Sequence, residues 1–399
     1  MIDLLFFTAL GILLGIITGT VPGLHVNTVS LILLGLAIAN PYHLAVMIMA
    51  MAITHTIWDF IPSIFLGAPE GDTALSVLPG HKLFLEGRGL EAIYLTTAGG
   101  LGVILLSLLS LPILIPTIPL FYQGIHNYIH WVLIIIALVI IFSEHGLRRR
   151  LLAFLCFTLS GILGILVLDS FILPSHSFIF PVFTGLFGIS TLIISLNRKT
   201  MVPKQTTETP KIPKRLALSG TIKALFSGVL VGTLPGIGAS QATTLSQQIT
   251  RKGDHREFLI SIGSINTVVA LFSLISLYTI LRPRSGAAVA VQQVLTDFGI
   301  NELLLLVAVA LISAGISSFL LIKSVKKIIS VLQETDYKRL TISIIIFLIF
   351  LTYLFTDPGG LLVLFVSTAT GLLAPLLGVK RSNSMGVLMV PLILFYMGI

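Results

Sequence analysis

Long apolar segments separated by short polar breaks dominate this sequence of 399 residues. All but two of its 24 lysines and arginines fall in or next to those breaks. The two exceptions, Arg282 and Arg284, flank a proline inside an apolar stretch. A charge is costly at membrane depth, and such charges usually mark an ion or substrate pathway. The pattern therefore predicts a membrane protein with an anion site or pathway around these arginines.

The apolar segments are long enough to cross a bilayer as helices, which takes roughly 20 residues. Apolar residues make up 55% of the chain, charged residues 10%, and the mean hydropathy is +1.05, which excludes a single water-soluble globule. Because backbone groups in lipid need internal partners, we expect an all-α polytopic membrane protein. The predicted apolar runs lie at about 90–110, 129–143, 151–171, 178–196, 258–281, 301–322, 340–355, 359–379 and 384–399.

Other classes of protein find little support in the composition. The net charge of +8 is spread over short loops beside the apolar segments, as in the positive-inside pattern, and does not indicate nucleic-acid binding. The single cysteine, Cys156, excludes an intrachain disulfide. No zinc-protease, nucleophile-elbow or Walker A motif occurs, so we expect no enzyme activity, no cofactor and no metal site. An intramembrane enzyme and a purely structural scaffold remain as minor alternatives.

An internal repeat divides the chain. Residues 15–25 (GIITGTVPGLH) return as residues 228–238 (GVLVGTLPGIG), and residues 68–74 (APEGDTA) align with residues 282–288 (RPRSGAA) at nearly the same offset. We expect a first transmembrane repeat at 1–196, a Pro- and Lys-rich linker at 197–218 and a second repeat at 219–399.

Charge predicts that the two repeats have opposite orientations. In four pairs of corresponding loops, one member carries lysine or arginine and the other does not. For example, Arg148–Arg150 corresponds to the segment at 357–360, which has no lysine or arginine. If the basic member of each pair is cytoplasmic, the repeats are inverted. Both termini then lie outside, the linker lies inside, and the protein is a multi-pass component of a prokaryotic cytoplasmic membrane.

Each repeat holds two apolar segments interrupted by proline and glycine, at 15–38 and 61–79 and at 228–249 and 279–295. Such broken or re-entrant helices at matching positions of two repeats indicate a transporter's binding site. A half-helix that begins at the break points its N–H groups and positive dipole end at the gap, which suits an anion.

Several polar residues in these segments are candidates for the site. His55 and Asp59 stand four apart and share a helix face, which suits either a proton relay or one structural hydrogen bond. Asn266 suits either ligand binding or helix packing. The candidate substrate-binding residues are Pro22, Gly23, His25, Asn27, Pro69, Gly71, Pro235, Gly236, Gly238, Ser240, Asn266, Arg282, Arg284 and Ser285; the candidate ion-coupling residues are His55, Asp59, Glu70 and Asp72.

With these motifs, the chain resembles the permease of tripartite tricarboxylate transporters, the TctA family. The resemblance rests on residues 19–24 (GTVPGL), 61–69 (IPSIFLGAP) and 232–238 (GTLPGIG), and it covers essentially the whole chain. Several positions depart from the family pattern: His25 and Asp59 stand where glycine is usual, and Gly67-Ala68 replaces an Asn-Thr pair. Arg282 and Arg284 also stand where apolar or small residues are usual.

The resemblance implies a secondary transporter of a di- or tricarboxylate that works by alternating access and is coupled to Na⁺ or H⁺. It also implies a small membrane subunit and an extracytoplasmic binding protein as partners, and a homodimer is a further expectation. The short Pro-Gly signature is similar as well to that of polyprenyl-phosphate transporters. A carrier of lipid-linked phosphate, with its tail left in the bilayer, is therefore the alternative function.

Overall fold

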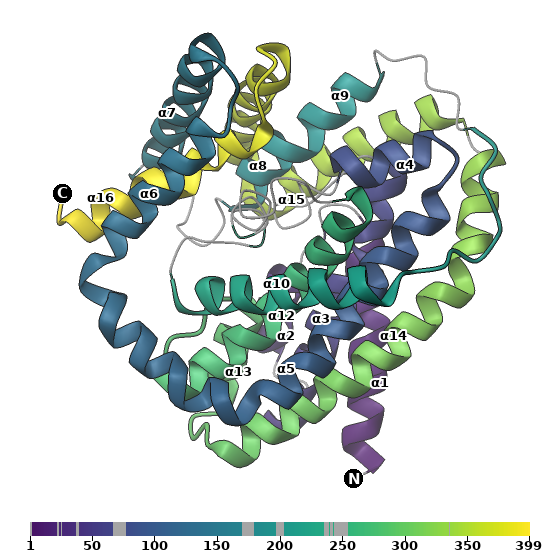
Figure 1. The fold of residues 1–399 in the computed structure, drawn as a ribbon, viewed down its shortest axis with the longest axis vertical. Helices are drawn as coiled ribbons and strands as arrows, with labels where there is room; N and C mark the ends of the chain where they lie inside the picture. Colours follow the sequence, from purple (N-terminus) through teal and green to yellow (C-terminus); the bar gives the residue numbers. More distant parts are fainter. Residues whose placement is uncertain are drawn as a thin grey trace.

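The computed structural model describes residues 2–21, 24, 26–36, 40–66, 77–169, 179–196, 203–234, 239, 242, 254–334 and 336–399. Within these ranges every regular element is helical (Figure 1). The elements are α1 (Ile2–Thr20), α2 (Val26–Leu36), α3 (Pro41–Trp58), η1 (Pro62–Leu66), η2 (Val77–His81), α4 (Lys82–Leu85), α5 (Gly89–Ile125), η3 (His126–Tyr128), α6 (Ile129–Phe142), α7 (Leu147–Asp169), α8 (Ile179–Phe183), η4 (Thr184–Ile189), α9 (Ser190–Leu196), α10 (Lys214–Thr233), α12 (His255–Ile280), α13 (Gly286–Val294), α14 (Ile300–Glu334), α15 (Tyr337–Leu376), η5 (Arg381–Met385) and α16 (Gly386–Met397).

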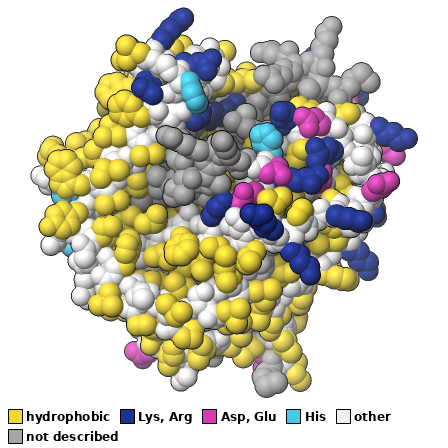
Figure 2. Space-filling model, in the orientation of Figure 1, with side chains coloured by type: hydrophobic (Ala, Val, Ile, Leu, Met, Phe, Trp, Pro, Cys, Tyr) yellow, Lys and Arg dark blue, Asp and Glu magenta, His cyan; other side chains and the backbone are white. Residues whose placement is uncertain are grey.

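The helices are those of a membrane protein. Among the described residues, eight helical segments are long and apolar enough to cross a bilayer. Large apolar side chains such as Leu109, Phe226 and Phe365 are exposed and would face lipid. Figure 2 shows one face that is mostly hydrophobic, with lysines and arginines gathered in its upper and right-hand parts. The prediction of an all-α polytopic membrane protein is confirmed.

Two helix pairs in the middle of the bundle pack in the same way. α1 lies against α3, where a Cβ on Gly19 would stand 2.8 Å from the Cβ of Trp58. α10 lies against α12, where a Cβ on Gly232 would stand 2.8 Å from the Cβ of Phe272. Glycines allow such close approach of helix backbones, a common arrangement between membrane helices. These are glycines that the internal repeat aligns with one another.

Two long helices flank these pairs. α5 packs along α12, and α14 packs along α3. At the first crossing the backbones are so close that a Cβ on Gly99 would overlap the carbonyl oxygen of Ile260, and one on Gly263 would overlap that of Thr96. Core helices α3 and α12 are thereby enclosed on several sides, and most of their side chains are buried.

Helices from one half of the chain also pack against helices from the other half. α7 packs against α16, and α15 packs against η4. In the first contact a Cβ on Gly164 would overlap the backbone of Val387, and in the second a Cβ on Gly371 would overlap that of Leu186. Each sequence half therefore contributes a helix to a packing unit with the other half.

The helices formed by three groups of apolar residues differ in extent or regularity from a simple span. The polar segment around Pro358 is not a loop, because α15 continues through it from Tyr337 to Leu376 and joins the two runs predicted at 340–355 and 359–379. The run at 178–196 forms α8, η4 and α9 in succession, and the run at 384–399 contains the 12-residue α16. The buried backbone of a helix retains its hydrogen bonds even where its sequence is locally polar, so hydropathy alone misplaces such boundaries.

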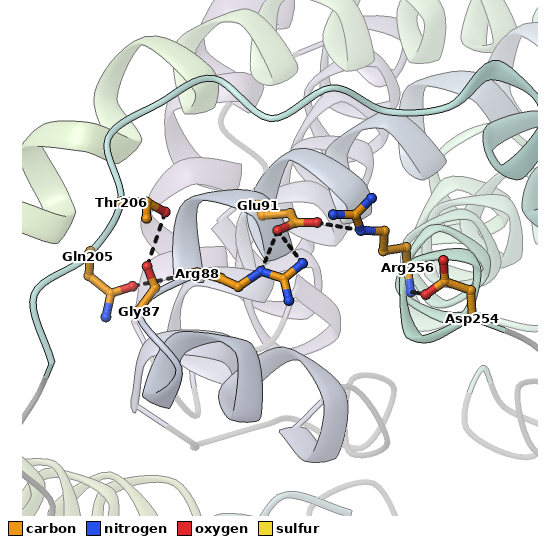
Figure 3. Close-up of polar contacts among 8 residues, drawn as sticks. Gly87, Arg88, Glu91, Gln205, Thr206, Asp254 and Arg256 are labelled. Atoms are coloured by element: carbon orange, nitrogen blue, oxygen red, sulfur yellow. Dashed lines mark hydrogen bonds and ion pairs between the residues drawn. The ribbon is translucent and has the colours of Figure 1, made fainter.

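The segment predicted as a flexible linker is partly ordered by specific contacts (Figure 3). The buried Gln205 side chain accepts a hydrogen bond from the N–H of Gly89 at 2.9 Å and donates one to the carbonyl of Phe84 at 2.8 Å. Thr206 donates to the carbonyl of Gly87 through both its N–H and its hydroxyl. The last residues of the predicted linker, from Lys214, already belong to α10.

Candidate functional site

A cavity of about 120 Å³ lies where α2, α3, α10, α12 and α13 meet. Its lining combines apolar side chains with converging polar and charged ones, as in small-molecule sites. The lining residues are Val26, Asn27, Ala52, His55, Thr56, Asp59, Val231, Asn266, Val269, Ala270, Arg284, Ser285 and Ala287. Six of the predicted site residues, which are far apart in sequence, are therefore brought together: Asn27, His55, Asp59, Asn266, Arg284 and Ser285.

Two half-helices begin at this cavity. α2 starts at Val26 and α13 starts at Gly286, each just after a proline-containing break predicted from the sequence. Ser285 is the N-cap of α13, and its hydroxyl accepts a hydrogen bond from the N–H of Ala288 at 3.3 Å. The two starts are in contact, since a Cβ on Gly286 would stand 2.6 Å from Cγ of Asn27. Both positive dipole ends therefore face the same space, an arrangement that favours an anion.

Arg284 brings a full positive charge to the cavity. Its Nη2 donates to the carbonyl of Thr233, at the end of α10, at 2.7 Å. Its Nε is buried and has no hydrogen-bond partner. Arg284 also belongs to none of the ion pairs found among the described residues. A guanidinium with a donor left over can bind a carboxylate or phosphate oxygen.

Arg282, the other arginine of the predicted pair, does not line the cavity. Its side chain is exposed and its guanidinium lies 5.8 Å from the ring centroid of Tyr122, a cation–π contact with α5. The two arginines thus differ in exposure and in their access to the cavity, although Tyr122 is near both of them.

Asp59 and Asn266 join the two core helices across the cavity. The Asn266 Nδ2 donates to Oδ2 of Asp59 at 2.8 Å and to the carbonyl of Thr56 at 3.1 Å. Asp59 is 2% exposed and Asn266 is 3% exposed. The sequence left two roles open for Asn266, ligand binding and helix packing. In the structure Asn266 joins the two helices and also lines the cavity, so its position suits both roles.

His55 lies one helical turn before Asp59 on the same face of α3. Its Nδ1 is 3.1 Å from the hydroxyl of Thr18 on α1, and its side chain is 2% exposed. The predicted pair of ionisable groups is therefore buried and lines the cavity together with Arg284. Such groups inside a membrane protein are costly and mark a pathway for substrate, ion or proton.

The cavity walls on α3 and α12 use the same helical positions. α3 contributes Ala52, His55 and Thr56, and α12 contributes three residues with the same spacing, at 266, 269 and 270. The shift in numbering between the two sets is the one that relates Pro69 to Pro283 in the sequence repeat.

Contacts between first-turn residues join helices at both ends of the bundle. Tyr42 and Arg256 are related by the same shift in numbering, whereas Glu91 and Glu302 depart from it by three residues. At one end, Oε1 of Glu91, in the first turn of α5, lies 2.7 Å from Nε of Arg256 in the first turn of α12 (Figure 3). Glu91 also pairs with Arg88 at 2.8 Å. At the other end, Glu302 in the first turn of α14 accepts a hydrogen bond from Tyr42 in the first turn of α3 at 3.1 Å.

Sequence reasoning missed Ser273, which does not line the cavity but contacts the residues that do. The signal was present, because the repeat offset that relates Pro69 to Pro283 also relates Asp59 to Ser273.

The remaining predicted residues lie outside the described residues: Pro22, Gly23, His25, Pro69, Glu70, Gly71, Asp72, Pro235, Gly236, Gly238 and Ser240.

Comparison with known proteins identifies relatives of the whole chain. The model of the "Tripartite tricarboxylate transporter TctA family" matches residues 5–386. A protein of Methanocaldococcus jannaschii named "Uncharacterized protein MJ1079" is 34% identical over 405 residues, covering 98% of this chain and 99% of that protein. No solved structure matches.

Proposed function

Because this chain belongs to the tripartite tricarboxylate transporter TctA family, we propose that it is a secondary transporter that moves a small organic anion, a di- or tricarboxylate, across the cytoplasmic membrane. The observation that carries the proposal is the cavity in which two half-helix N-termini meet the guanidinium of Arg284, whose Nε has no hydrogen-bond partner. All three features favour negative charge in a space that is lined by both polar and apolar side chains.

One carboxylate of the substrate binds the Arg284 guanidinium, and the N–H groups at the start of α2 and α13 bind its other oxygens. Asn27 and Ser285 lie at those two helix starts and line the cavity. Because the lining also has valine and alanine side chains, the ligand is partly desolvated, which strengthens its interaction with the fixed charge and dipoles.

Transport is coupled to Na⁺ or H⁺ through the buried Asp59 and His55. Asp59 lines the same cavity as Arg284, so its charge changes the electrostatic potential at the substrate. Protonation of Asp59, or binding of a cation next to it, lowers the repulsion that an anionic substrate meets there. This coupling accounts for a carboxylate in a cavity built for an anion.

Alternating access is the transport mechanism that suits a chain with two inverted repeats. Two relations support the repeats: matching glycine contacts in the α1–α3 and α10–α12 pairs, and matching cavity positions on α3 and α12. Under the predicted topology the Glu91 end is cytoplasmic and the Glu302 end, like both termini, is outside. The repeats then comprise 1–196 and 219–399.

The name of the family implies a transporter of three parts. We therefore expect a small membrane subunit and an extracytoplasmic binding protein as partners, and a homodimer as the form of the permease itself. The binding protein delivers the anion to the outer end, where Tyr42 donates a hydrogen bond to Glu302.

The test is binding and uptake by the purified protein in proteoliposomes. A panel of mono-, di- and tricarboxylates is compared with inorganic phosphate and a soluble polyprenyl-phosphate analogue, each with and without a Na⁺ or pH gradient. Gradient-dependent accumulation of a di- or tricarboxylate supports the proposal. Binding of the lipid-phosphate analogue alone would contradict it and favour the lipid carrier.

A further inference from the structure

A buried hydroxyl binds the backbone of the broken hairpin between α12 and α13. Ser273 of α12 accepts a hydrogen bond from the N–H of Arg284 and another from the N–H of Ser285, both at 2.7 Å. Its side chain is fully buried. Both N–H groups belong to residues that precede the first residue of α13, so no helical carbonyl serves them.

The turn before Arg284 needs such support because its backbone is strained. α12 ends at Ile280, and its C-cap Leu281 has φ 54°, the only positive φ at a non-glycine residue among the described residues. A left-handed conformation at a residue with a branched side chain is costly and persists only where its surroundings enforce it. The N–H groups of Leu281 and Arg282 both bond the carbonyl of Ser276, so α12 itself holds one side of the turn.

The other side of the turn is held by Ser273 and by Arg284 itself. The Arg284 side chain bonds the carbonyl of Thr233 at the end of α10, while its backbone is bonded to Ser273 on α12. Backbone and side chain of this one residue are thereby fixed to two different helices. The backbone N–H of the exposed Arg282 bonds the carbonyl of Ser276 and not the hydroxyl of Ser273.

We infer that Ser273 is the positioning residue of the site: it fixes the hairpin tip so that the Arg284 guanidinium and the first N–H groups of α13 face the cavity. The inference rests on the proposed function in so far as the cavity binds an anion. Ser273 itself does not touch the ligand, and it acts only through Arg284 and Ser285.

The first test concerns the hairpin alone and needs no substrate. Amide hydrogen exchange of a peptide spanning 281–289 is measured by mass spectrometry on the purified protein and on Ser273→Ala. The matched control is Ser264→Ala, which removes an equally buried α12 hydroxyl that donates to the carbonyl of Ile260 in its own helix. We expect about 10-fold faster exchange in Ser273→Ala only, and exchange restored in Ser273→Thr, which keeps the acceptor. Equal exchange in Ser273→Ala and wild type would overturn the inference.

A second test separates positioning from general structural damage. In carboxylate uptake, Ser273→Ala should raise KM about 10-fold and leave the maximal rate within about twofold. The same substitution in an Arg284→Ala background should have no further effect on KM. A KM increase of equal size in both backgrounds would overturn the inference, because Ser273 would then act independently of Arg284.

The two proposals can fail separately. If no carboxylate binds the wild-type protein, the proposed function fails and the exchange measurement still decides the role of Ser273. Where Ser273→Ala does not give folded protein, Ser273→Cys takes its place, since a thiol is a weaker acceptor of similar size. Exchange in that variant as slow as in wild type would count against the inference.

Discussion

Asn266 on α12 donates a hydrogen bond to the carboxylate of Asp59 on α3 at 2.8 Å, and this bond joins the two halves of the chain at the wall of the cavity. Both residues are almost fully buried. The amide can donate to the carboxyl group in its charged and in its protonated form, so the bond holds the helices together whether or not Asp59 carries a proton. That property suits a group that titrates during transport.

Asp59→Asn should abolish uptake driven by a pH gradient and leave substrate binding detectable. The amide oxygen still accepts from Asn266, so the helix contact survives while the ionisable group is lost. The measurement is uptake into proteoliposomes at different imposed gradients, and the control is Asp297→Asn in an exposed loop. If uptake by Asp59→Asn depends on the pH gradient as uptake by the wild type does, Asp59 and His55 have a structural role and do not couple protons to transport.

Glu91→Gln should loosen the end of the bundle where α5 and α12 begin. The substitution removes the charge that pairs with Arg88 and Arg256, and these partly exposed pairs contribute about 0.2–1 kcal/mol each. A cysteine at Ala52, which lines the cavity, should then react faster with an impermeant thiol reagent added from the cytoplasmic side.

The matched variant for this experiment is Glu302→Gln, which weakens the contact with Tyr42 at the opposite end. It should raise labelling from the outside instead. Both variants are made in a Cys156→Ala background, because Cys156 is the single native cysteine. Identical labelling of both variants from both sides would argue against gates at these two positions.

Much of the core follows from the sequence because the physical constraint is local. Proline and glycine fix where helices break, so the starts of α2 and α13 lie within a few residues of the predicted breaks at Pro22-Gly23 and Pro283. The two ionisable residues of α3 were also predicted to share a face from their spacing alone.

The parts that the sequence did not predict depend on long-range packing. Hydropathy cannot tell that Arg284 turns towards the cavity while Arg282 lies over Tyr122, since both flank the same proline. Nor does hydropathy predict that α15 continues through Pro358. The packing of α15 against η4 and α9 is a long-range contact that supports the helix there. The packing of α16 against α7 and of η4 against α15, between the two halves, has no signature in the local sequence.

Gly99→Ala should destabilise the contact between α5 and α12. The added methyl group would overlap the carbonyl oxygen of Ile260, and such overpacking costs about 1–3 kcal/mol. Gly315→Ala in the long helix α14 is the control, since nothing lies within 4 Å of its added Cβ. We expect that control to be neutral or more stable by about 0.5–1 kcal/mol. Thermal unfolding in detergent measures both, and equal transitions would contradict the close crossing.

Cysteines at Gln123 and at Lys204 should be labelled from opposite sides of the membrane. Both side chains are exposed, and the predicted topology places the first outside and the second in the cytoplasm. Impermeant reagents applied to intact cells and to inverted vesicles of the Cys156→Ala background provide the measurement. Labelling of both positions from one side would contradict the inverted repeats.

Ligand affinity of Arg284→Ala compared with Arg282→Ala tests the account most directly, because the two arginines differ in position and not in chemistry. Removing the charged partner of a largely desolvated carboxylate should cost roughly 2–5 kcal/mol, a loss of about 30-fold to several thousand-fold in affinity for the transported acid. Arg284→Lys should recover only part of it, since lysine keeps the charge and loses the planar fork. Arg282→Ala, which removes an exposed contact with Tyr122, should change affinity by less than about threefold. Wild-type affinity in a folded, monodisperse Arg284→Ala protein would contradict the assignment of this cavity as the anion site.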